Sequence, residues 1–175
     1  PLPCAVPVHA ERARMPCRPW GASVQRLRSE VRVELRDRVL RYQVDERFVN
    51  LGSVVGEADY VFPLPKNAAF EGLKLEINGE LVAGEVLDAE RARQRDPALV
   101  EWIGHGLLRT RIFPIAPGEE KRVVVRFQAV AEREGDALRV DYRRAGSGER
   151  RVVRVADARD WPPVGSQSSF TFVYP

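Results

Sequence analysis

The chain has 175 residues, 44% hydrophobic and 30% charged, a composition typical of one globular domain with short extensions. Its formal net charge is only +3, because 28 lysine and arginine residues are balanced by 25 acidic ones. These interleaved charges argue against nucleic acid as a partner, since nucleic-acid binding needs a basic face that neighbouring acids do not neutralise. No apolar stretch has the length of a membrane span, so we expect none.

Residues 1–28 contain five prolines and no sustained apolar period, so we interpret them as an irregular N-terminal arm. Both cysteines of the chain, Cys4 and Cys17, lie in this arm. A disulfide between them would contribute on the order of 3 kcal/mol and would imply an oxidising compartment. Two free thiols are the alternative. A zinc site is not expected, because only His9 lies nearby and the spacing fits no tetrahedral ligand pattern.

From residue 29 the sequence alternates between apolar and polar residues, which is the period of half-buried antiparallel strands. This alternation is clear over residues 31–35 and 40–48. A further apolar segment, residues 60–64, includes Pro63 and is followed by Pro65, so we expect it at a sheet edge or a strand end.

A hairpin is expected next. The alternating residues 73–77 run into Asn78-Gly79, a dipeptide that favours a two-residue turn because both of its positions tolerate positive φ. Residues 81–86 would then form the returning strand.

The pattern changes towards helix between residues 88 and 104. Asp88 precedes a helix-favouring run over residues 89–93, and Asp96-Pro97 places a capping residue before a proline at the first helical position. An apolar stripe follows, in which we expect Trp102 to be a core residue: Leu99, Val100, Trp102 and Ile103. One or two short helices are therefore expected here.

The rest of the chain alternates again over residues 108–112, 123–129, 138–142 and 170–174. Residues 144–169 carry glycines and prolines without a period, and we interpret them as a loop. Many short strands separated by turn signals predict an all-β fold, an antiparallel β-sandwich with one or two short helices. We expect residues 29–143 to form this domain, with residues 144–175 packing on it as a loop and a terminal strand.

Several short motifs follow one another in order between residues 30 and 130. Their residues are Phe48 and Asn50, then Glu57, Ala58, Tyr60, Phe62, Pro63, Leu64 and Pro65, and later the turn at Pro117 and Gly118. This ordered set resembles the signature of the vault protein inter-alpha-trypsin (VIT) domain family. The sequence departs from the family where Gln94-Arg95-Asp96-Pro97 follows the helix-favouring run at once. The resemblance implies a module without catalytic chemistry that commonly precedes a von Willebrand factor A domain in secreted or envelope proteins.

No set of catalytic or metal-binding side chains stands out. His105 follows the expected helix, where a structural role at the helix end is the simpler interpretation than a role in a catalytic triad. Glu119-Glu120 lie in a turn and are expected to be solvated. Ser166-Gln167-Ser168-Ser169 lacks the leading aspartate of the A-domain cation motif, and Gly146-Ser147-Gly148 lacks the lysine of a phosphate-binding loop. We therefore expect no enzyme, no metal and no cofactor.

The sequence thus predicts a non-catalytic protein-interaction or scaffolding module of a secreted or cell-envelope bacterial protein, paired with a von Willebrand factor A domain in the same polypeptide. One alternative is a carbohydrate- or ligand-binding β-sandwich, which predicts a row of exposed aromatic side chains on one sheet face. Another is the accessory domain of a hydrolase. A neighbour could add a strand at the edge of residues 123–129 or of residues 170–174. The expected interface residues are Trp20, Trp161, Phe170, Phe172 and Tyr174.

Overall fold

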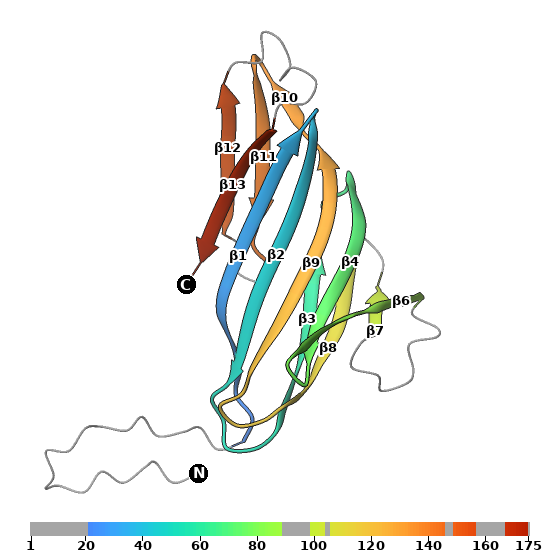
Figure 1. Ribbon diagram of the computed structural model, residues 1–175, viewed down its shortest axis with the longest axis vertical. Helices are drawn as coiled ribbons and strands as arrows, with labels where there is room; N and C mark the ends of the chain where they lie inside the picture. Colours follow the sequence, from blue (N-terminus) through green and yellow to red (C-terminus); the bar gives the residue numbers. More distant parts are fainter. Residues whose placement is uncertain (1–20, 89–98, 104–105, 146–148, 157–166, 175) are drawn as a thin grey trace, which may run out of the picture.

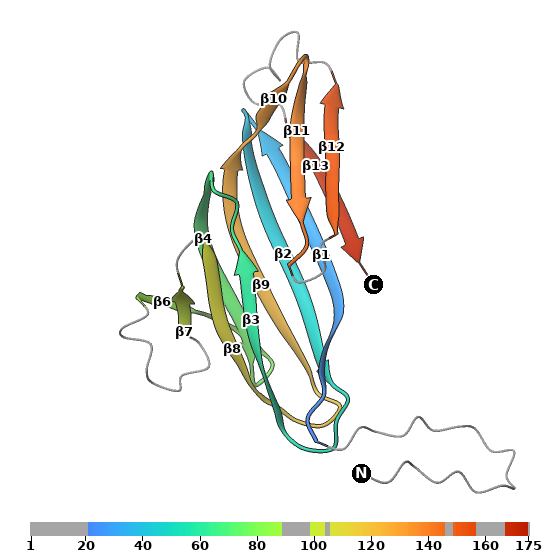
Figure 2. The ribbon, with the colours of Figure 1, turned by 180° about the vertical axis from the view of Figure 1, so that it is seen from behind.

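The protein is a β-sandwich in which one long sheet is covered on one face by two smaller sheets (Figures 1 and 2). The computed structural model describes residues 21–88, 99–103, 106–145, 149–156 and 167–174. These residues form strands and no helix, so none of them belongs to a helix that could cross a membrane. The all-β class predicted from the sequence is confirmed.

Within the described residues, thirteen strands make up three sheets. The six-stranded sheet has the spatial order β13 (Gln167–Tyr174), β1 (Val24–Arg36), β2 (Val39–Asn50), β9 (Glu120–Val130), β4 (Ala68–Ile77) and β5 (Glu80–Ala83). The four-stranded sheet has the order β3 (Gly56–Pro63), β8 (Leu107–Ile115), β7 (Leu99–Trp102) and β6 (Glu85–Asp88). The three-stranded sheet has the order β10 (Glu132–Glu134), β11 (Ala137–Arg143) and β12 (Arg150–Ala156).

The six-stranded sheet has one buried face because its strands alternate in polarity. Val31, Val44 and Val125 lie side by side in the ladder and are fully buried. Their sequence neighbours, such as Arg32, are exposed on the opposite face. The half-buried strands predicted by the alternation are confirmed.

The two small sheets lie side by side over that buried face, and the strands that border each other are β3 and β11 (Figure 2). The border runs above β2. Tyr60 of β3 packs edge-on against Phe48 at 5.6 Å between ring centroids, and Tyr142 of β11 stacks on Tyr42 at 6.3 Å. We call this border the seam: β3, β11 and the β2 residues 40–48 beneath them. The position of β3 at a sheet edge, ending at Pro63, agrees with the effect expected of its prolines.

The hairpin predicted at Asn78-Gly79 is confirmed. Asn78 and Gly79 have φ of 52° and 83°, and Ile77 pairs with Glu80 across the turn. The return runs as β5 in the six-stranded sheet and then, after Gly84, as β6 in the four-stranded sheet. The chain therefore crosses from one layer of the sandwich to the other within this segment.

The prediction of a helix over residues 96–104 is wrong in the part that the structure describes, residues 99–103. Leu99–Trp102 forms β7, which runs parallel to β6 and antiparallel to β8. Val100 is fully buried opposite Thr110, whereas Trp102, expected in the core, is 40% exposed. Four apolar residues are too few for their period to separate a strand from a helix, so pairing with β8 decided the structure. Asp88 ends β6, and the helix-favouring run over residues 89–93 lies outside the described residues.

Two expectations about the C-terminal half also need correction. The segment expected to be a loop, residues 144–169, contains the strand β12. Its Val153 and Val155 pack on the core. The arginines around them obscured this apolar alternation in the sequence. The strand over residues 123–129 is not an edge, because β9 lies between β2 and β4. The terminal strand β13 is an edge, and it pairs with β1 from Ser29↔Tyr174 to Arg36↔Gln167. At the other end of the chain, β1 already begins at Val24.

Candidate functional site: a groove at the seam

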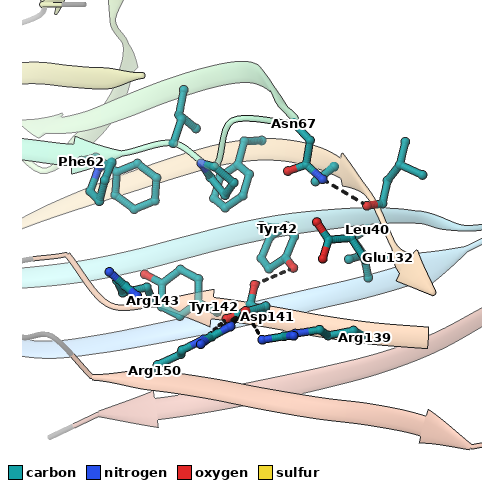
Figure 3. A pocket seen from close by; sticks show the side chains of 16 residues that line it. Leu40, Tyr42, Phe62, Asn67, Glu132, Arg139, Asp141, Tyr142, Arg143 and Arg150 are labelled. Carbon is teal, nitrogen blue, oxygen red and sulfur yellow. Dashed lines mark hydrogen bonds and ion pairs between the residues drawn. The ribbon is translucent and has the colours of Figure 1, made fainter. Parts of the chain in front are cut away.

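A groove opens at one end of the seam, between the end of β3 and β11 (Figure 3). Its volume is about 350 Å³, near the lower end for pockets that hold ligands. The floor is formed by Tyr42, Phe62 and Phe127, which come from β2, β3 and β9. The site therefore exists only because both small sheets lie over the same part of the long sheet.

The floor is an aromatic cluster shared with the core. Tyr42 stacks on Phe127 with 4.5 Å between ring centroids, and Phe62 lies 5.6 Å from Phe127. All three side chains are at least 96% buried, so the floor is close-packed and a ligand would meet only ring edges. In the described part of the chain, the exposed aromatics Trp102 and Phe113 lie on opposite faces of the four-stranded sheet. The aligned aromatic row expected of a carbohydrate-binding sandwich is not present among these residues.

One wall of the groove is apolar and offers no backbone donor. It consists of Pro63, Leu64 and Pro65, at and just beyond the end of β3. The two prolines have no N–H, and the Leu64 N–H donates to the Gly106 carbonyl at 2.7 Å. This wall can accept apolar side chains but cannot pair with another strand as a donor.

The opposite wall is the side of β11 that faces away from β12. β12 pairs with β11 along residues 137–143, whereas β10 pairs with its other side only from Ala137 to Arg139. No described strand pairs with residues 140–143 on that side. The Tyr42 hydroxyl donates to the Asp141 carbonyl at 3.0 Å, which places this carbonyl on the groove side because Tyr42 lies in the floor. The wall is therefore an open strand edge.

The rim is charged. The Asp141 carboxylate accepts hydrogen bonds from the Arg150 Nε at 2.9 and 3.0 Å and from the Arg139 guanidinium at 3.0 Å. The Arg150 hydrogen bond is the main cause that lowers the pKa of Asp141 below its ordinary value. Arg143 also lines the groove, is exposed, and makes no ion pair within the described residues. With Glu132 as the second lining acid, the rim has one more cation than anions.

The other end of the seam is closed over a buried polar cluster, which we define as Arg26, Glu46, Tyr60 and Tyr142. Glu46 is fully buried, and its Oε1 lies 3.4 Å from Arg26 Nε. The carboxylate oxygens of Glu46 and the hydroxyls of Tyr60 and Tyr142 make no hydrogen bond of regular geometry, although the contact of Tyr60 with Glu46 contributes to the raised pKa of Tyr60. Burial, and then the charge of Glu46, raise the pKa of both tyrosines well above its ordinary value.

This cluster joins the three sheets. The Arg26 guanidinium donates to the Ala145 carbonyl at 2.6 Å, just beyond the end of β11, while its Nε faces Glu46 of β2. Tyr60 and Tyr142 reach the cluster from β3 and β11. Because Glu46 is completely buried, a substrate has no access to its carboxylate, and the ion pair serves the structure. In the part of the chain that is described, no three residues of the types that bind metals lie close together.

The motif residue Asn50 is a hydrogen-bonding centre for three chain segments at the end of the sandwich. It is fully buried at the end of β2. Its amide nitrogen donates to the carbonyls of Val54 (2.8 Å) and Ile115 (2.9 Å). Its side-chain oxygen accepts from the N–H groups of Ser23 (3.1 Å) and Gly52 (2.9 Å). The motif residue at this position is therefore explained by the structure of the loops.

The turn at Pro117 and Gly118 is fixed beside Asn50. Gly118 has φ of 77°, and the Glu119 N–H donates to the Ala116 carbonyl at 2.9 Å, as in a type II turn with proline second and glycine third. The Glu119 carboxylate accepts from the Ala116 N–H at 2.7 Å and lies 2.7 Å from Lys121 Nζ. These contacts, the Lys121 hydrogen bond first, lower the pKa of Glu119.

The remaining motif residues are structural. Phe48 and Tyr60 are buried against each other. Glu57 is exposed at a bulge of β3 between Gly56 and Ala58. Four motif residues line the groove: Phe62, Pro63, Leu64 and Pro65. The other described motif residues do not line it.

The residues predicted as an interface lie apart from the groove. The side chains of Phe170 and Phe172 pack on the core, and Tyr174 is 98% buried beneath the Arg144 guanidinium, which is 4.9 Å from its ring. An interface on β13 would therefore use its backbone edge and its outward side chains. Trp20, Trp161, His9, His105 and the cysteine pair Cys4 and Cys17 lie outside the described residues.

The sequence contained a signal for the buried cluster that the prediction did not use. Leu40, Tyr42, Val44 and Phe48 share one face of a strand, and Glu46 falls on the same face by the same period. A charged residue at an inward position needs a partner in the core. The sequence contained no comparable signal for the groove. The charged residues within 139–143 alternate with apolar ones, as they would on any strand with one solvent-exposed face.

Comparison with known proteins gives two findings. A sequence model of the Vault protein inter-alpha-trypsin domain (VIT) matches residues 27–127, more than half of the chain. The chain is also similar to the protein mono-ADP-ribosyltransferase PARP4 of Mus musculus, at 39% identity over 70 residues. The similar stretch covers 40% of this chain and 4% of that protein, so the chain spans a small part of this relative. Strands β10 to β13 lie beyond the range that the family model matches.

Proposed function

The chain belongs to the VIT domain family, a family of protein-interaction modules, and we propose that it is a non-catalytic scaffolding module that docks a von Willebrand factor A domain of the same polypeptide. We place it in a secreted or cell-envelope bacterial protein. The docking surface in this proposal is the edge of β13, on the six-stranded sheet. The observation that carries it is the composition of this strand.

β13 differs from the other sheet edges in having no residue that discourages strand addition. Proteins protect exposed edges with charged residues, proline or bulges. β13 has the sequence Gln-Ser-Ser-Phe-Thr-Phe-Val-Tyr, eight residues without charge or proline. Each of the other edge strands in the described sheets, β5, β3, β6, β10 and β12, has at least one charged residue. An open, uncharged edge of this length supports docking by β-augmentation.

Lysines on the outward positions of β13 are expected to weaken this docking. Thr171 and Val173 are exposed and face away from the core, with Val173 at 49%, so Thr171→Lys with Val173→Lys leaves the fold intact. Strand addition would desolvate both charges, and we expect affinity to fall about tenfold or more. The measurement is isothermal titration of the chain with the A domain of its polypeptide.

The matched control is Val82→Lys, at a similarly exposed position (39%) on the opposite edge of the same sheet. It should bind as the wild type does. Equal loss in both variants, or no loss in the β13 variant, contradicts docking at this edge. Concentration-dependent dimerisation in sedimentation, without binding to the A domain, would replace the proposed partner by a second copy of the chain.

The secreted or envelope location is tested by the state of the two cysteines. If Cys4 and Cys17 form a disulfide in an oxidising compartment, the intact mass of the protein isolated from its host should rise by about two units on reduction. Alkylation of both thiols before any reductant is added would contradict the disulfide and remove the support for this location.

A further inference from the structure

We propose that the seam groove binds an extended segment of a partner polypeptide, which adds as a strand to the open side of β11 and pairs an acidic side chain with Arg143. This site is separate from the edge of β13 and goes beyond the docking proposed above. The groove, the open backbone and the arginine rim each limit what the occupant can be.

The open side of β11 supplies the template for a strand. In an antiparallel strand the N–H and C=O of one residue point to the same side, and successive residues alternate. Arg139 pairs with Glu132 of β10 on the groove side, and the Asp141 carbonyl meets Tyr42 there, so Asp141 and Arg143 both direct their backbone groups into the groove. The Asp141 carbonyl can accept a second hydrogen bond, because a carbonyl oxygen has two lone pairs.

The groove fits the inward side chains of such a segment. The wall of Pro63, Leu64 and Pro65 offers no backbone donor, so it cannot form the two-way ladder that β11 offers, and its apolar side chains favour apolar groups of the occupant. Ala129, with its small side chain, lines the groove beside the aromatic floor. A volume of about 350 Å³ is enough for a short stretch of chain.

The rim selects the charge of the occupant. Arg139 and Arg150 are both engaged by Asp141, which fixes their guanidinium groups. Arg143 is exposed on the same strand face and has no ion pair within the described residues. A carboxylate on the outward side of an added strand would lie in the cross-strand position next to Arg143, the geometry in which opposite charges stabilise a sheet. The expected occupant therefore alternates apolar residues facing inward with polar or acidic residues facing outward.

The test begins with a phage-displayed library of random octapeptides selected on the whole chain. We expect the enriched peptides to alternate apolar and polar residues, to contain an acidic residue and to lack proline. One such peptide, labelled with fluorescein, is then titrated by fluorescence polarisation against the wild type, Arg143→Glu and Arg41→Glu. Arg41 is exposed on the uncovered face of the six-stranded sheet, so its reversal is the matched control.

Arg143→Glu should weaken binding about tenfold or more, Arg41→Glu should not, and a peptide with lysine in place of its acidic residue should regain affinity for Arg143→Glu. Amide resonances of residues 140–143 should shift on titration. Failure to enrich peptides, equal effects of the two reversals, absence of the charge-swap rescue, or shifts confined to residues 167–174 would each overturn the proposal. Docking at β13 would be unaffected, because Arg143→Glu should still bind the A domain.

Discussion

Replacement of Arg26 by methionine is expected to lower the free energy of unfolding by about 3–5 kcal/mol, the cost of leaving a buried charge without its partner. Glu46 is fully buried, its carboxylate oxygens make no hydrogen bond of regular geometry, and Arg26 is its ion-pair partner at 3.4 Å. The substitution also removes the donor to the Ala145 carbonyl. Urea denaturation followed by circular dichroism measures the change.

Removing the charge of Glu46 as well should recover much of this loss. The double variant Arg26→Met with Glu46→Leu replaces a buried ion pair by hydrophobic residues of similar volume, a change that is often nearly neutral. Arg28→Met is the surface control. Its side chain is 52% exposed and pairs with Glu30 at 3.0 Å, so a loss of about 1 kcal/mol or less is expected. An Arg26→Met variant as stable as Arg28→Met would contradict a role for the buried pair.

The second large effect is expected at Asn50. Asn50→Ala removes two donors and one acceptor that together serve four backbone groups, in a site without solvent access. Unsatisfied buried groups cost about 1–3 kcal/mol each, and partial relaxation leaves an expected net loss of about 3 kcal/mol. Thermal and urea denaturation should agree on it.

Asn50→Asp distinguishes hydrogen bonding from simple volume. An aspartate keeps the acceptor for Ser23 and Gly52 but cannot donate to the carbonyls of Val54 and Ile115, so it should be at least as destabilising as alanine. Asn67→Ala is the control, since Asn67 makes one exposed 3.4 Å bond to Val130 and should change stability by less than about 0.5 kcal/mol. Equal stability of the Asn50 and Asn67 variants would contradict the proposed role.

The family motif could be found from the sequence, but its meaning came from the structure. The order of Phe48, Asn50, Tyr60 and Pro63 identified the family. The pattern could not show that Asn50 binds three segments, because two of them, at Ser23 and Ile115, are distant in sequence. The buried ion pair of Glu46 was not predicted for the same reason. Its inward position followed from the period, whereas its partner Arg26 required the fold.

The sequence by itself determined the all-β class, the position of most strands, the hairpin at Asn78-Gly79 and the family. These follow from local rules: the two-residue period of a half-buried strand, and the turn residues that accept positive φ. Only the tertiary structure decided that residues 99–102 form a strand, that β9 is interior while β13 is an edge, and that β3 and β11 enclose a groove. The physical reason is that edges, seams and pairing partners depend on contacts between segments far apart in the chain, which no local period encodes.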